Sequence, residues 1–146
     1  MVVEDVSNSV IRVNGKRFYI DGYLRKNLDV CKKVIKKDWD MMLAVDGDEG
    51  GGKSVFAMQI AKYLDEDFGI DQIAFTPEEF MKKVLAAKKY QAVIFDEAYS
   101  GLSSRGTMGR VNKMIVRMLA EIRQKNLFIL IVLPSFFDLD LSLIHI

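Results

Sequence analysis

The sequence predicts an α/β fold of three layers, with helices on both faces of a mainly parallel sheet. Short apolar runs typical of strands alternate with segments in which apolar residues recur every three or four positions, the period of one helix face. Two of these runs, 92–95 and 127–133, are apolar at every position, which is typical of strands buried on both faces. A third run, 41–45, leads through a glycine-rich loop into a helical pattern. Such alternation favours parallel strands joined by helices.

Residues 1–39 are predicted to form an N-terminal attachment made of a β-hairpin and a helix. Two alternating runs, 10–13 and 17–20, flank Asn14-Gly15, a pair that tolerates the positive φ angles of a tight hairpin turn. After Asp21-Gly22, apolar residues recur with helical spacing, and this helix is expected to end near Trp39.

Residues 40–140 are predicted to form the core domain. A strand at 41–45 is followed by a helix at 54–64 and a short strand at 73–75. Thr76 is a capping residue and Pro77 suits the first helical position, so the next helix should run to about Lys89. The remaining elements are a strand at 92–95, a helix at 108–124 and a strand at 127–133 that Pro134 stops.

The last six residues, 141–146, are interpreted as a non-native tail. They match one reading frame of a transposon-end adapter used in DNA library preparation. We therefore expect that the gene was cut at the codon of Asp140 and that the domain is truncated at its C-terminus. We assign no function to His145, which lies in the tail.

Length and composition predict a globular, unexported protein. The chain has 146 residues, 50% of them hydrophobic and 28% charged, with 21 basic and 20 acidic side chains, so disorder is excluded. No apolar run approaches the ~20 residues of a membrane-spanning helix, and the N-terminus lacks a secretion signal, so a cytoplasmic protein without a membrane segment is expected. A single cysteine, Cys31, excludes an intramolecular disulfide and a cysteine-based zinc cluster.

Charge is distributed in three blocks. Residues 25–37 carry six bases against Asp29 alone, residues 65–79 carry six acids and no base, and residues 105–125 are basic again. Charge runs of this kind are most often solvated helix faces.

The glycine-rich loop has the pattern G-x-x-x-x-G-K-[ST] between an apolar strand and a helix, which is the setting of a phosphate-binding loop. Backbone N–H groups of such a loop point at phosphate oxygens, the lysine reaches the β and γ phosphates, and the serine hydroxyl binds Mg²⁺. We therefore predict ATP and Mg²⁺ as ligands. The predicted nucleotide-binding residues are Gly47, Asp48, Glu49, Gly50, Gly51, Gly52, Lys53, Ser54 and Val55.

Two acids follow the apolar strand at 92–95. Ligands of open α/β sheets bind at the carboxyl ends of the strands, where Asp96 and Glu97 lie. Adjacent residues point in different directions, so Asp96 can hold Mg²⁺, together with Ser54, while Glu97 activates a water in line with the γ phosphate. The alternative is a strand that ends in two solvent-exposed acids without a catalytic role.

With the loop and the acid pair separated by one strand–helix unit, the chain resembles P-loop ATPases of the additional-strand, catalytic-glutamate class, which contains RecA-like, AAA, FtsK and HerA motors. The resemblance implies that a strand lies between the phosphate-loop strand and the Asp96 strand, and 127–133 is the candidate. It also implies a homo-oligomeric ring with the ATP site at a subunit interface.

The resemblance suggests three further catalytic residues. Ser135 occupies the place of a γ-phosphate sensor, although a simple turn residue is an equal alternative. Arg123 stands where FtsK and HerA relatives carry an arginine before the sensor strand, and Arg105 lies in a loop that could reach a neighbouring subunit. The helix bases between them are either contacts to nucleic-acid phosphates, a finger in trans, or a solvated face.

The arrangement over residues 40–140 also looks like zonula occludens toxin-like and DNA packaging or translocating ATPases of phages and mobile elements. It implies Mg-dependent ATP hydrolysis that powers nucleic-acid translocation or packaging, in the host cytoplasm if the gene is viral. Two alternatives remain open. One is an ATPase for virion or protein assembly or secretion, and the other is a small-molecule kinase or nucleotide switch.

Overall fold

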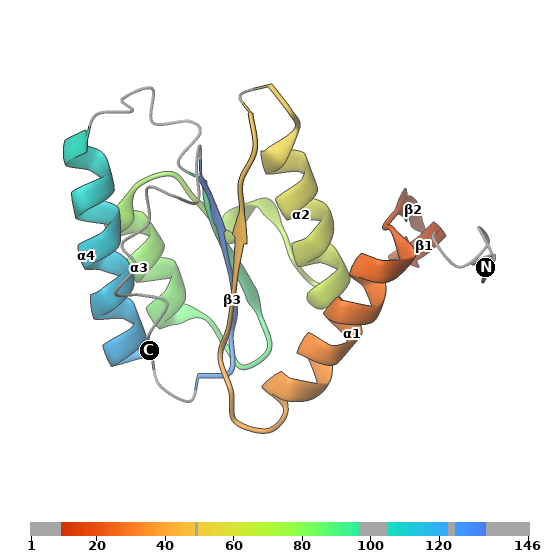
Figure 1. The fold of residues 1–146 in the computed structure, drawn as a ribbon. Coiled ribbons are helices and arrows are strands. Elements are labelled where there is room, and N and C mark those ends of the chain that lie inside the picture. Colours follow the sequence, from red (N-terminus) through yellow and green to blue (C-terminus); the bar gives the residue numbers. More distant parts are fainter. Residues whose placement is uncertain (1–9, 49, 97–104, 123–124, 134–146) are drawn as a thin grey trace.

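The computed structural model describes residues 10–48, 50–96, 105–122 and 125–133, and these form an α/β fold (Figure 1). Glu49, the segments 97–104 and 123–124, and the predicted truncation point and tail within 134–146 lie outside the described residues. Within the described part of the chain, no helix is long and apolar enough to cross a membrane.

The predicted N-terminal hairpin and helix are both present. Strands β1 (Val10–Val13) and β2 (Lys16–Tyr19) pair antiparallel, and the turn between them has φ angles of 50° at Asn14 and 77° at Gly15. Helix α1 (Gly22–Ile35) follows, with the Asp21 carboxylate accepting hydrogen bonds from the first backbone N–H groups. The helix stops before Trp39, because Asp38 adopts a left-handed φ of 62° that a helix cannot continue.

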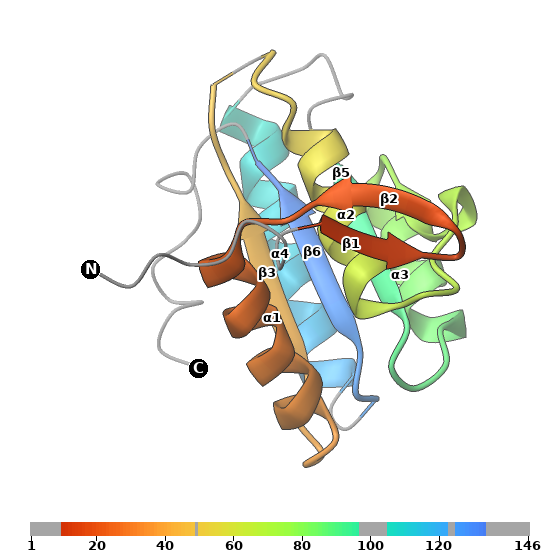
Figure 2. The ribbon, with the colours of Figure 1, turned by 90° about the vertical axis from the view of Figure 1, so that its right-hand side faces the viewer.

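The central sheet has four parallel strands in the order β3-β6-β5-β4. Figure 2 shows β6 beside β3. These are β3 (Met41–Val45), β4 (Ile73–Ala74), β5 (Ala92–Asp96) and β6 (Phe128–Val132). Every residue of β5 and β6 is buried, in agreement with their unbroken apolar sequences. Strand β6 lies between β3 and β5, the position predicted for the run at 127–133.

Three helices connect these strands. Helix α2 (Lys53–Leu64) follows β3, α3 (Pro77–Ala86) follows β4, and α4 (Arg105–Glu121) precedes β6, with a 3₁₀ turn at Ile70–Gln72. Helix α4 begins three residues earlier than predicted. Helix α3 was predicted to reach Lys89 but ends at Ala86, where Lys125 donates hydrogen bonds to the carbonyls of Val84 and Leu85. A cation at exposed terminal carbonyls stabilises a helix end there.

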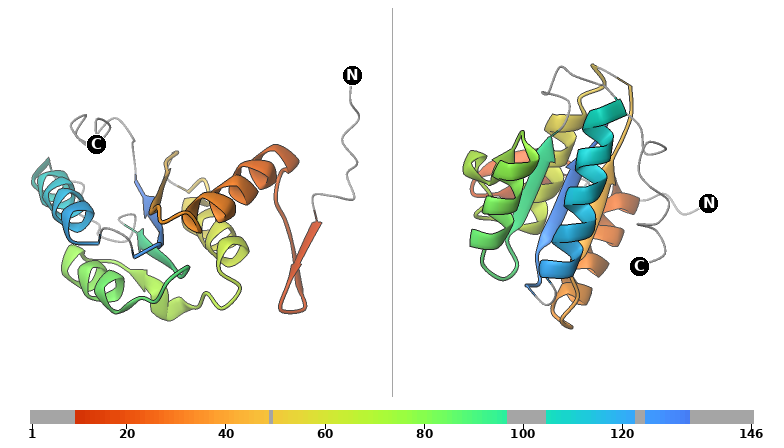
Figure 3. Two further views of the ribbon diagram at one scale, coloured as in Figure 1. Left: turned by 90° about the horizontal axis from the view of Figure 1, so that it is seen from below. Right: turned by 90° about the vertical axis from the view of Figure 1, so that its left-hand side faces the viewer.

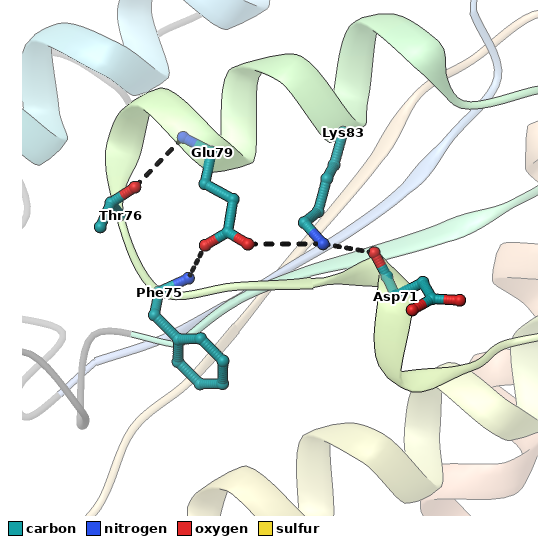
Figure 4. A network of polar contacts seen from close by, with 5 residues as sticks. All are labelled: Asp71, Phe75, Thr76, Glu79 and Lys83. Atoms are coloured by element: carbon teal, nitrogen blue, oxygen red, sulfur yellow. Dashed lines mark hydrogen bonds and ion pairs between the residues drawn. The ribbon is translucent and has the colours of Figure 1, made fainter.

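The start of α3 is fixed by the capping predicted at Thr76, shown in Figure 4. The Thr76 hydroxyl accepts from the Glu79 N–H at 3.2 Å, and the Glu79 carboxylate accepts from the Phe75 N–H at 3.1 Å. Lys83 lies 3.5 Å from Glu79 and donates to the carbonyl of Asp71. The network therefore joins the 3₁₀ turn, the end of β4 and the first turns of α3.

Helices cover both faces of the sheet, so the core consists of two apolar clusters (Figure 3). Alternate residues of one strand enter different clusters, as the pleat requires. Ile94 and Leu130 pack with α1, α2 and the hairpin, whereas Phe95 and Ile131 pack with α3 and α4. The three-layer arrangement predicted from the sequence is thus observed.

A buried carboxylate joins α2 to β5 at the amino ends of the strands, whereas the glycine-rich loop lies at their carboxyl ends. Asp65, 8% exposed, follows α2 directly and accepts from the Ala92 N–H at 3.0 Å and the Gln72 amide at 2.9 Å. Gln72 also donates to the Ala92 carbonyl at 2.7 Å. Because buried polar groups must be paired, these bonds fix the end of α2 against the first residue of β5.

Replacing Asp65 by alanine is expected to lower the free energy of unfolding by about 3 kcal/mol, because the Ala92 N–H and the Gln72 amide lose a charged acceptor inside the protein. Urea unfolding measures the change. The control is Asp67→Ala, two residues away and exposed, which should stay within about 0.5 kcal/mol of wild type. Equal effects of both substitutions would contradict the structural role of Asp65.

Candidate functional site

The predicted site residues that the structure describes meet at the carboxyl end of the sheet. Val132 of β6 pairs with Val45 of β3 on one side and with Asp96 of β5 on the other. The Leu133 N–H donates to the Val45 carbonyl at 2.9 Å, so the pairing persists to the end of the strands. Val45, two residues before the glycine-rich loop, therefore lies level with Asp96 and two strand spacings away, roughly 10 Å.

The loop is built on backbone conformations that glycine supplies. Gly50 and Gly52 have φ angles of 77° and 79°, and Gly47 has 149°. Between them the Gly51 N–H donates to the Asp48 carbonyl at 3.1 Å, and a Cβ at Gly51 would lie 3.1 Å from the same oxygen. Side chains at these positions would strain or crowd the turn, so the glycines are required by the shape of the loop.

Lys53 points into the loop that it follows. The side chain is 9% exposed, and its ammonium donates to the Gly47 carbonyl across the turn. A Cβ on Gly47 would lie 3.7 Å from two carbons of the lysine stem. An ammonium held against a backbone carbonyl of such a loop is a point charge suited to an anion with several oxygens, such as a polyphosphate.

The first turn of α2 supplies further donors. Gly52 is the N-cap residue and offers no side chain to bond the N–H groups of the first turn. Those N–H groups and the positive end of the helix dipole are the usual partners of a bound phosphate. Ser54 is half-buried beside them, and Val55 is 55% exposed on the next position. The N-terminus of α2 therefore fits the phosphate group predicted for residues 47–55.

Of the predicted acid pair, Asp96 lies within the described residues. It ends β5 and is 4% exposed, although aspartate is rarely buried unless it is engaged by a partner. The described residues contain no group of three histidine, cysteine or acidic side chains that could hold a metal ion by themselves. Mg²⁺ bound here would need phosphate oxygens and waters besides Ser54 and Asp96, which is its usual mode in nucleotide sites.

Four predicted site residues, Glu49, Glu97, Arg123 and Ser135, lie outside the described residues. Arg105 is the first residue of α4, so it belongs to a helix rather than to the loop expected from the sequence. Arg105 therefore lies at the N-terminal end of α4, the helix that follows β5 and Asp96 along the chain.

Two exposed arginines of α4, Arg110 and Arg117, are paired with acids. Arg110 lies 2.8 Å from Glu78 of α3, and Arg117 lies 2.7 Å from Glu121 one turn away. Among the three interpretations of these helix bases, the observed pairs fit the solvated face. Pairs as exposed as these contribute little to stability.

The polar network of Asp65 and Gln72 was not found by sequence reasoning. Its bonds join residues that are 7, 20 and 27 positions apart, and no periodicity or motif spans them. The sequence offered one signal, the block 65–79 with six acids and no base. That signal predicted solvent-exposed carboxylates and not a buried one.

Comparison with known proteins identified no relative: neither protein-family models, nor curated proteins, nor solved structures gave a match to this chain.

Substituting Gly52 by alanine is expected to lower the free energy of unfolding by about 1–2 kcal/mol, because alanine disfavours the left-handed φ of 79°. Chemical denaturation measures it. Gly69→Ala is the matched control, since Gly69 has an extended φ of −136° and open space around its Cβ position. That control should be neutral or slightly stabilising. Loss of stability in both variants would argue against a strained loop.

Proposed function

We propose that this chain is a P-loop ATPase of the additional-strand, catalytic-glutamate class that binds Mg-ATP and hydrolyses it. The observation that carries the proposal is the position of Lys53 inside a glycine loop, with buried Asp96 at the same edge of the sheet and β6 between their strands. A loop of this shape is typical of phosphate recognition, and an acid on a neighbouring strand is typical of the metal site that accompanies it.

Each residue has a distinct part in the proposed reaction. The loop backbone and the first turn of α2 hold the phosphate chain, while Lys53 exchanges its bond to Gly47 for the β and γ phosphate oxygens. Ser54 and Asp96 would hold Mg²⁺ when it is bound, and the ion would supply positive charge to the phosphates. Glu97, the residue after Asp96, accepts a proton from the attacking water.

The proposed use of this hydrolysis is nucleic-acid translocation or packaging by a homo-oligomer, in keeping with the phage and mobile-element ATPases that the sequence resembles. Arg105, Arg123 and Ser135 remain candidates for completing the site, two as arginines acting across a subunit interface and one as a γ-phosphate sensor. An ATPase for assembly or secretion would use the same site without a response to DNA. A kinase or switch would not need Glu97.

Nucleotide binding is tested with Lys53→Ala. The affinity for a fluorescent ATP analogue should fall at least about tenfold, because a charge-assisted bond to phosphate contributes on the order of 1.5–3 kcal/mol. Lys82→Ala, which removes an exposed lysine from α3, is the control and should bind as wild type does. Undiminished binding by Lys53→Ala would contradict a phosphate site in this loop.

Hydrolysis is tested with Glu97→Gln in the purified protein. We expect ATP turnover to fall about 10²- to 10⁴-fold while nucleotide affinity is retained, because the general base is lost but the phosphate contacts remain. Glu66→Gln, an exposed acid after α2, is the matched control. Stimulation of turnover by DNA would support translocation. Turnover indifferent to both Glu97 and DNA would instead favour a switch or kinase.

A further inference from the structure

The outer face of α1 combines lysines with exposed apolar side chains. Positions spaced alternately by three and four residues lie on one side of a helix, and here all five such positions are exposed. The opposite side of the helix carries the buried residues Leu28 and Ile35. We call the exposed stripe the α1 outer face, and its residues are Tyr23, Lys26, Val30, Lys33 and, in the turn that follows, Lys37.

This face is positively charged and has no acid of its own. Asp29 is the one acid within α1, and its carboxylate accepts a hydrogen bond from the Tyr63 hydroxyl of α2, on the inner side of the helix. Lys32 is also held there, with its ammonium 4.1 Å from the centre of the Tyr63 ring. Lys33 and Lys37 form no ion pair with the described part of the chain.

Exposed aromatic rings stand at both ends of the face. Tyr19 is 59% exposed at the end of β2, and Tyr23 is 74% exposed in the first turn of α1. Trp39, two residues beyond Lys37, is 65% exposed. Tryptophan and tyrosine are usually buried along most of their surface, so three such exposed residues in and next to one basic helix are unusual for a merely solvated surface.

We propose that the α1 outer face, together with Tyr19 and Trp39, binds single-stranded nucleic acid. Lysines attract the phosphate backbone, and exposed aromatic rings stack on bases that no complementary strand covers. Helix α1 is about 21 Å long, enough to contact several successive phosphates. Single-stranded nucleic acid would be the partner of the proposed ATPase. The biological role of this binding surface, but not the binding itself, rests on the proposed function.

An anionic membrane surface fits the same face less well. A helix that lies on a membrane buries a continuous apolar face in the lipid. The continuous apolar face of α1 is already packed in the core through Leu28 and Ile35, and the outer face carries lysines along its middle. The exposed apolar residues, Tyr23 and Val30, are separated by nearly two turns.

The surface is separate from the phosphate loop. Helix α1 contacts the C-terminal end of α2 through Asp29 and Tyr63, whereas the loop precedes the N-terminal end of α2 (Figure 1). Nucleic acid on α1 would therefore not compete with nucleotide, and α2 connects the two sites.

The test uses the whole chain and a fluorescently labelled single-stranded oligothymidine, with affinity measured by anisotropy over a series of salt concentrations. Lys33→Glu/Lys37→Glu is compared with Lys82→Glu/Lys88→Glu, which reverses two exposed lysines on and after α3 and makes the same change in net charge. At about 0.1 M salt we expect the first variant to bind about 20-fold more weakly or worse, with the salt slope reduced by about 1.4. The second variant should stay within about twofold of wild type.

Aromatic stacking has its own readout. Trp39 is the one tryptophan of the chain, so intrinsic tryptophan fluorescence reports this surface alone. Oligothymidine should quench it and added salt should restore it. Tyr23→Ala should weaken binding at least about fivefold, with an unchanged melting temperature as evidence of an intact fold.

Several outcomes would overturn the inference. These are equal weakening of both double variants, unchanged Trp39 fluorescence on binding, or duplex DNA binding as tightly as the single strand. Binding of phosphatidylserine vesicles with the same dependence on Lys33 and Lys37, without oligonucleotide binding, would assign the face to lipid instead.

Failure of this inference and failure of the proposed function are distinguishable. ATP binding and turnover of Lys33→Glu/Lys37→Glu, measured without nucleic acid, should match wild type because α1 lies away from the loop. Normal turnover without oligonucleotide binding would overturn this inference alone. Oligonucleotide binding as expected in a chain that hydrolyses no ATP would overturn the ATPase and leave the binding surface standing.

Discussion

The pairing of β6 with strands on both sides determines the rest of the structure. Its five residues are all buried, and its register puts Val132 between Val45 and Asp96 at the carboxyl end of the sheet. Strand β6 is thus the element that joins the strand before the glycine-rich loop to the strand that ends at Asp96. A strand buried on both faces and paired along both edges has little freedom to shift, because a slip by one residue would reverse every side chain.

Polar contacts reinforce the arrangement of these strands at their amino ends. Asp65 and Gln72 tie the end of α2 to the first residue of β5, so the helix that follows the glycine-rich loop is anchored to the strand that ends at Asp96. The two parts of the proposed nucleotide site are therefore linked twice, by β6 in the sheet and by Asp65 at its base. A displacement of α2 along its axis would break buried hydrogen bonds.

Helix α2 has a different partner at each end. Its N-terminus follows the glycine-rich loop, where Lys53 donates a hydrogen bond to the Gly47 carbonyl. Its C-terminal turn holds α1 through the bond of Tyr63 to Asp29 and the position of Lys32 over the Tyr63 ring. These inner contacts leave the other lysines of α1 on the outside. In the proposed motor, α2 would be the element through which nucleotide state and nucleic-acid contact influence each other.

The sequence alone determined the elements and the loop. Unbroken apolar runs marked β5 and β6, Asn14-Gly15 marked the hairpin, and the glycines with Lys53 marked the strand–loop–helix unit, because each of these signals depends on neighbours along the chain. The end of α3 was misjudged, since Lys125 from a distant segment satisfies its last carbonyls. Only the tertiary structure decided that Asp65 is buried, that Asp29 faces inward, and that α1 presents lysines with Tyr23 to solvent. These features depend on which surfaces pack together, and local sequence carries no record of partners that are far away in the chain.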